Sequence, residues 1–258
     1  MCHSVKLLTL VISLAIAGSV SHAGAQSGAR PDAPQPVAPP VTVHDAPRNV
    51  LRDQAAIWTS PLHIRAHNAA GPIVLVLATT VAITADHQAM TSVVSHDATL
   101  NNHADQASQA LVGTLVAAPA ALFVVGRLHH NEHATETGIL SAESVVDSLA
   151  VGEAGKLITW RERPDVDGAR GRWFQSGTGI NSSFPSEHAL VAWSAASTIA
   201  HEYPGFWTDT AVYTLAGGVS IARVMARRHF PSDVLVGSAL GWMIGRYVVH
   251  RRHHYHPK

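Results

Sequence analysis

Residues 183–202 read SFPSEHALVAWSAASTIAHE and predict a helix with a chemically useful start. Pro185 and the hydroxyl of Ser186 mark the helix start, and the apolar run from Ala189 predicts a buried face. A helix N-terminus presents free N–H groups and the positive end of the helix dipole, which together bind phosphate. His188 then lies in the first turn, where it can donate a proton to a bound anion. The alternative is a capped helix with an incidental histidine.

The rest of the chain also reads as helical, because apolar residues recur with helical spacing and no convincing alternating strand is found. Further helices are expected over residues 49–60, 69–85, 110–125, 138–160, 208–227 and 231–249. The predicted fold class is therefore mostly α, a helical bundle of about six core helices. Runs 69–85 and 110–125 carry no charge and approach the roughly 17–25 residues that a membrane crossing needs. Central helices of a soluble bundle are equally apolar, so both interpretations stay open.

Composition excludes several classes of protein. The 258 residues include 18 Lys+Arg and 18 Asp+Glu, so the chain lacks the basic excess expected of a nucleic-acid-binding protein. Its 47% hydrophobic and 14% charged residues are typical of a folded chain rather than a disordered one. The single cysteine, Cys2, rules out a disulfide scaffold and a cysteine-based zinc site.

The N-terminal region predicts export. Lys6 precedes an apolar stretch at residues 7–20 and then small residues, the pattern of a cleaved signal peptide over 1–25. A proline-rich linker is expected over 26–48 and the folded domain over 49–258. The predicted location is exported, either periplasmic or associated with the inner membrane. A retained transmembrane helix is the alternative for the first segment.

A second motif, Lys156-Leu-Ile-Thr-Trp-Arg-Glu-Arg163-Pro164, places two cations seven residues apart. On a helix this spacing returns to nearly the same face after two turns. Two cations on one face repel each other, but together they suit an anion with several oxygens. The alternative is a solvated basic face.

A third motif, Arg223-Val-Met-Ala-Arg-Arg-His229-Phe-Pro-Ser-Asp233, combines a cation, an imidazole and a carboxylate. Arg223 lies on an apolar helix with no acidic neighbour in sequence, and a buried arginine needs an anionic partner. Asp233 is well spaced to hold one nitrogen of His229, which leaves the other nitrogen free as a nucleophile. The alternative is a helix C-cap followed by an N-cap aspartate.

Taken in order, the motifs Lys-x6-Arg-Pro, Pro-Ser-x-His and Arg-x5-His-x3-Asp resemble the type 2 phosphatidic acid phosphatase (PAP2) superfamily. That superfamily also contains bacterial non-specific acid phosphatases and vanadium haloperoxidases. The resemblance is sharp over residues 156–233. It implies a PAP2/haloperoxidase-like helical fold and a phosphatase acting on a phosphorylated lipid or soluble small molecule, with membrane association open.

The resemblance also implies residue roles. His229 would attack phosphorus and form a phosphohistidine, Asp233 would hold its imidazole, and His188 would protonate the leaving oxygen. The implied phosphate-binding residues are Lys156, Arg163, Ser186 and Arg223. No metal or other cofactor is expected.

Two positions depart from the family pattern. Glu187 stands where the family usually has glycine, and Ala222 stands where it usually has serine. The alternative functions are a vanadium-dependent haloperoxidase on the same residues and a non-catalytic helical membrane protein. Residues 129–133 formally match the zinc pattern His-x-x-Glu-His, with a looser metal site or a solvated turn as the alternatives. The tail at 251–256 offers further histidines for a metal or an anionic surface, with a frayed chain end as the alternative.

Overall fold

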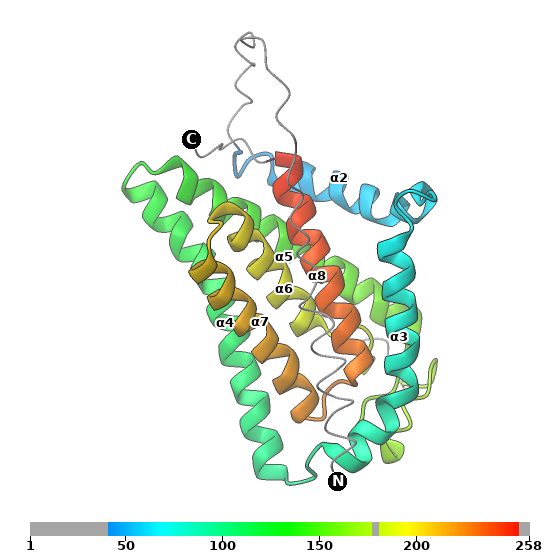
Figure 1. Cartoon of the computed structure of the whole chain (residues 1–258). Helices are drawn as coiled ribbons and strands as arrows, with labels where there is room; N and C mark the ends of the chain where they lie inside the picture. Colours follow the sequence, from blue (N-terminus) through cyan, green and yellow to red (C-terminus); the bar gives the residue numbers. More distant parts are fainter. Residues whose placement is uncertain (1–40, 177–180, 253–258) are drawn as a thin grey trace. The chain divides into compact units, whose positions relative to one another are not determined.

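A computed structural model describes residues 41–176 and 181–252, which form a bundle of α-helices (Figure 1). The expected signal peptide, most of the expected linker and the tail from residue 253 lie outside the described residues. The α-helices are α2 (Ala46–Thr59), α3 (Ala70–Gln88), α4 (Ala98–Leu128), α5 (Glu132–Thr159), α6 (Glu187–Glu202), α7 (Phe206–Met225) and α8 (Pro231–Arg252). Short helical turns are η1 (Ser60–His63), η2 (Ala89–Val93) and η3 (Asp167–Ala169). The described part of the chain contains no strand, which confirms the mostly α fold class.

α4 and α5 begin well before the stretches that predicted them, at Ala98 rather than residue 110 and at Glu132 rather than residue 138. The expected helix 110–125 is the second half of the 31-residue α4, which starts where the side chain of Asp97 accepts hydrogen bonds from the backbone N–H of Thr99 and Leu100. The first half of α4 is polar and gave no apolar signal. Likewise, α2 reaches into the expected linker because Pro47 fits the first turn of a helix.

α6 forms the centre of the bundle, and most of its residues are buried. On one side Ala196 packs with Leu115 of α4 and Val219 of α7. On the other side Leu190 packs with Leu140 of α5 and with the end of α8. The helix that carries the Pro-Ser-x-His motif is thus held by its neighbours on both sides.

Three glycines bring α8 into backbone contact with α6. A β-carbon at Gly237, Gly241 or Gly245 would lie 2.5, 2.2 or 2.4 Å from a backbone oxygen of α6 or its N-cap. Such separations are far shorter than van der Waals contact, so only glycine permits this approach. As a result the N–H of Ser186 donates to the carbonyl of Asp233 at 3.0 Å, which fixes the starts of both helices together.

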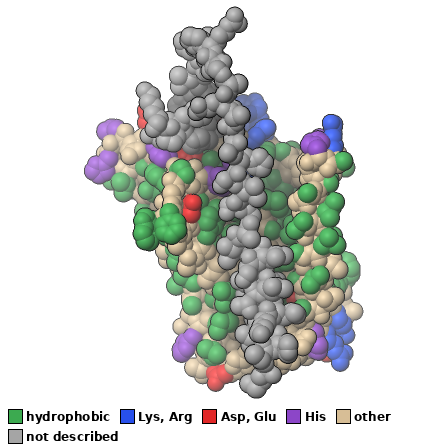
Figure 2. All heavy atoms as spheres, viewed as in Figure 1, with side chains coloured by type: hydrophobic (Ala, Val, Ile, Leu, Met, Phe, Trp, Pro, Cys, Tyr) green, Lys and Arg blue, Asp and Glu red, His purple; other side chains and the backbone are tan. Residues whose placement is uncertain are grey.

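α3 and α4 differ from the central helices in being apolar and largely uncovered. The segments Ala70–Val93 and Ala98–Leu128 are long and apolar enough to cross a membrane, yet only 22% and 17% of their most apolar stretches are buried. Hydrophobic side chains line the edge of Figure 2 where Figure 1 places α3. Low burial distinguishes these helices from the core helices of a soluble bundle, which are apolar because they are covered.

Candidate active site

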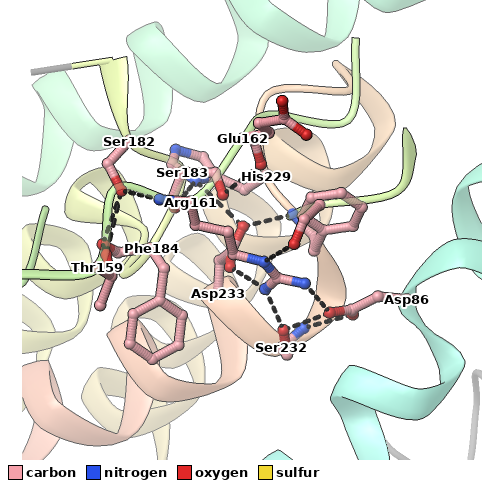
Figure 3. Close-up of polar contacts among 12 residues, drawn as sticks. Asp86, Thr159, Arg161, Glu162, Ser182, Ser183, Phe184, His229, Ser232 and Asp233 are labelled. Atoms are coloured by element: carbon pink, nitrogen blue, oxygen red, sulfur yellow. Dashed lines mark hydrogen bonds and ion pairs between the residues drawn. The ribbon is translucent and has the colours of Figure 1, made fainter. Parts of the chain in front are cut away.

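The three sequence motifs meet where the ends of several helices come together (Figure 3). The end of α5 and the segment after it bring Lys156 and Arg163, the start of α6 brings His188, and the α7–α8 connection brings His229. The charges of Arg163, Arg223 and Lys156 all act on His229. The sequence-predicted cations therefore lie close enough to the sequence-predicted nucleophile to lower its pKa.

His229 is held in one tautomer by a backbone carbonyl. Its Nδ1 lies 2.7 Å from the carbonyl oxygen of Ser183, and a carbonyl can only accept, so Nδ1 donates the hydrogen and Nε2 keeps its lone pair. Burial, followed by the charges of Arg223 and Arg163, lowers the pKa of His229 well below the usual value. The imidazole is consequently neutral near pH 7, the state that the predicted attack on phosphorus requires.

Asp233 contributes differently from the expectation. Its Oδ2 lies 3.8 Å from Nδ1 of His229, beyond hydrogen-bond distance. Oδ2 instead accepts from the N–H of Phe230 at 2.8 Å, which fixes the backbone next to the histidine. The carbonyl oxygen of Ser183, rather than the carboxylate of Asp233, accepts the hydrogen bond from the imidazole, because the carbonyl oxygen lies closer to Nδ1.

Arg161, which the sequence analysis passed over, is the buried centre of the polar network in Figure 3. It is 2% exposed and donates to Asp233 at 2.5 Å, to Asp86 at 2.7 Å and to the hydroxyl of Ser232 at 2.7 Å. Its guanidinium also lies 4.2 Å from the ring centre of Phe230. The only sequence signal was its place among the basic residues of the second motif.

Lys156 forms ion pairs with two carboxylates. Its Nζ donates to Oε1 of Glu153 at 2.8 Å and to Oε2 of Glu187. α6 begins at Glu187 with Ser186 as N-cap, so Pro185 precedes the helix rather than opening it as expected. The acidic residue at the usual glycine position therefore points at a predicted phosphate-binding cation.

Arg223 has an acidic partner that lies far away in sequence. Its guanidinium donates to Asp105 of α4 at 2.5 Å and to the hydroxyl of Ser108 at 3.2 Å, so the missing partner is supplied by the tertiary fold. Nε of Arg223 and Oγ of Ser186 are buried without a hydrogen-bond partner among the described residues. Two residues predicted to bind phosphate thus keep polar atoms unsatisfied.

His188 and Arg163 complete the predicted set. Burial, then the charge of Arg223, lowers the pKa of His188 to about 4. Nε of Arg163 donates to the carbonyl of Asn181 at 3.1 Å. The cluster combines two neutral imidazoles with several cations, which suits a tetrahedral oxyanion.

The His-x-x-Glu-His pattern does not form a zinc centre. Across residues 41–176 and 181–252, no three histidine, cysteine, aspartate or glutamate side chains are grouped so as to hold a metal ion. Nε2 of His133 instead lies 3.1 Å from Oε2 of Glu202. The pattern was matched in sequence only.

Comparison with known proteins places these motifs in a family. Residues 137–256 match the PAP2 superfamily, which confirms the resemblance. The lipid A 1-phosphatase of Porphyromonas gingivalis is 37% identical over 94 residues, which cover 36% of this chain and only 18% of that protein. A transmembrane PAP2-type phosphatidylglycerolphosphate phosphatase from Bacillus subtilis is 19% identical in its crystal structure, covers 80% of this chain and 96% of its own, and superposes with a TM-score of 0.47.

Proposed function

From the match of residues 137–256 to the PAP2 superfamily, we propose that this protein hydrolyses a phosphomonoester carried by a lipid. The observation that supports it is one cluster of two imidazoles and three cations, in which Nε of Arg223 and Oγ of Ser186 are left for a ligand. A phosphoryl group provides the acceptor oxygens that both atoms lack.

In the first step Nε2 of His229 attacks phosphorus. The N–P bond forms as the P–O ester bond breaks, and the electron pair of that bond leaves on the ester oxygen. His188 donates the proton to that oxygen. The pKa of His188, about 4 in the free site, rises when a phosphate dianion binds beside it, because the anion stabilises the imidazolium.

In the second step a water attacks the phosphohistidine, and neutral His188 takes a proton from it. The N–P bond breaks, inorganic phosphate leaves, and His229 regains its lone pair. Lys156, Arg163 and Arg223 stabilise the charge on the phosphoryl oxygens in both steps, so the proposed reaction uses no metal.

A lipid substrate is supported by the two uncovered apolar helices. α3 and α4 have the length and composition of membrane spans, and Asp86 near the end of α3 contacts the site through Arg161. We therefore propose that the protein is membrane-associated, with the site next to the end of a span. The lipid A 1-phosphatase that is 37% identical over 94 residues has a name that specifies a lipid substrate.

The test is hydrolysis by the purified full chain in mixed micelles, with phosphatidic acid compared with 4-nitrophenyl phosphate in excess EDTA. We expect faster turnover of the lipid, inhibition by vanadate, and an acid-labile phosphoenzyme that His229→Ala abolishes. Activity that EDTA removes and zinc restores would refute the metal-free mechanism. Bromide oxidation by the vanadate-loaded protein, without phosphate release, would favour the haloperoxidase.

Export is a further part of the proposal. The signal-peptide pattern of residues 1–25 lies outside the described residues. N-terminal sequencing of the protein purified from membranes tests it, since a cleaved signal leaves a mature chain that begins near residue 26.

A further inference from the structure

α2 turns Ile57 and several polar side chains inward and exposes large apolar side chains outward. Asp53 is its one fully buried residue and is 1% exposed, whereas Leu51 and Trp58 are 73% and 48% exposed. Leu51, Ala55 and Trp58 follow the i, i+4, i+7 spacing of one helical face, and Leu62 of η1 continues the apolar surface at 83% exposure. A surface helix of a soluble protein has the reverse arrangement.

The inward side of α2 is held by hydrogen bonds and ion pairs. The amide of Asn49 donates to Oε1 of Glu143 at 2.9 Å, and the amide of Gln54 donates to Oδ1 of Asp147 at 2.8 Å. Asp53 is paired with Arg252 at the end of α8. These directional contacts fix which face of α2 turns outward, so the exposed apolar face is set by the fold.

Charge and position identify what that face contacts. Arg48, Arg52 and Arg65 are exposed along the same segment, and within residues 41–176 and 181–252 none of the three forms an ion pair with an acidic side chain. Figure 1 shows α2 crosswise at the end of α3. The exposed apolar residues of α3 begin at Ile73, shortly after η1, so the two apolar surfaces lie close together along the chain.

We propose that α2 and η1 form an interfacial anchor in an anionic lipid bilayer. Leu51, Trp58 and Leu62 lie at the boundary of headgroups and acyl chains, and the flanking arginines contact lipid phosphates. α2 is docked at Arg252, the last residue of the 22-residue α8, whose start holds the active site. The anchor and the site are thus about 33 Å apart along α8, close to the roughly 30 Å thickness of the hydrocarbon core.

This inference rests on the proposed membrane association. Spin labels at different positions test the anchor and the membrane association independently. Cysteine is introduced at Leu51 or Leu62 in a Cys2→Ser background, with His44→Cys as the matched polar control and Val76→Cys on α3 as the span control. The labelled full chain is reconstituted in vesicles of phosphatidylglycerol and phosphatidylcholine. Accessibility to oxygen is then compared with accessibility to a water-soluble nickel chelate.

We expect the oxygen-to-nickel ratio at positions 51 and 62 to exceed that at position 44 several-fold. Water-like ratios at 51 and 62 with a lipid-like ratio at 76 would overturn the anchor and leave the membrane proposal standing. A water-like ratio at 76 as well would overturn both. Spin–spin broadening would identify a second copy on this face, and protection that deletion of residues 1–40 removes would identify the chain's own N-terminal segment. Either result refutes the anchor.

Discussion

Replacing Arg161 by methionine is expected to destabilise the protein and to slow catalysis together. The buried guanidinium donates to Asp86 and Asp233 at 2.7 and 2.5 Å. Methionine fills a similar volume but leaves two buried carboxylates without their cation. Removing one partner of a buried ion pair costs about 3–5 kcal/mol, which lowers the Tm of a chain of this size by roughly 6–20 °C.

The same change should lower kcat more than it raises KM, since Arg161 acts through Asp233 and the backbone beside His229 without facing substrate. Arg161→Lys keeps the positive charge but lacks the planar guanidinium with its several donors. It should therefore lose less Tm and less kcat than Arg161→Met. Arg170, which is exposed and lies in the same segment, provides the matched control Arg170→Met. Thermal unfolding in detergent and steady-state hydrolysis measure the effects. An Arg161→Met protein with wild-type Tm and kcat would refute the positioning role.

Three further predictions concern the site and the helix contact that holds it. Glu187→Gln removes one of the two carboxylates on Lys156, so vanadate should inhibit roughly fivefold more strongly, the equivalent of about 1 kcal/mol from one nearby charge; weaker inhibition would show that the glutamate positions the lysine instead. His188 is less basic in the folded than in the unfolded protein, with a pKa of about 4 against 6.5, so its contribution to stability falls as pH drops through that window. The loss of Tm between pH 7 and pH 4.5 should therefore be smaller in His188→Gln than in the wild type, and equal losses would contradict this. Gly241→Ala places a β-carbon 2.2 Å from a backbone oxygen of α6 and should lower both Tm and kcat, whereas Gly217→Ala, with no atom within 4 Å, should leave both unchanged or raise Tm slightly.

The helical fold could be predicted from sequence because it depends on local spacing, whereas the grouping of the three motifs into one site was implied by the family resemblance. The Pro-Ser start of α6 and the run after Ala189 are local signals. The extent of α4 was underestimated, because its first half is polar and begins at a capping side chain, Asp97. A cap satisfies the helix end without contributing an apolar pattern.

The buried ion pairs around the site could not be predicted from sequence, for a different reason. Arg161 and Asp86 are 75 residues apart, and Arg223 and Asp105 are 118 apart. Nothing in local spacing pairs residues at such separations, since the tertiary fold alone decides which carboxylate meets which guanidinium. The role expected of Asp233 shifted for the same reason, because a backbone carbonyl from another segment lies closer to His229.

The proposed crossing of the membrane by α3 has a topological consequence. α3 is the segment that joins α2 to Asp86 at the catalytic end, so if it traverses the bilayer the two ends open into different compartments. The basic residues Arg48 and Arg52 favour the cytoplasm for α2 under the positive-inside rule, which turns His229 outward. A cleaved signal that exported α2 would turn His229 inward. Knowing the compartment of either end therefore fixes which leaflet delivers the phosphorylated lipid.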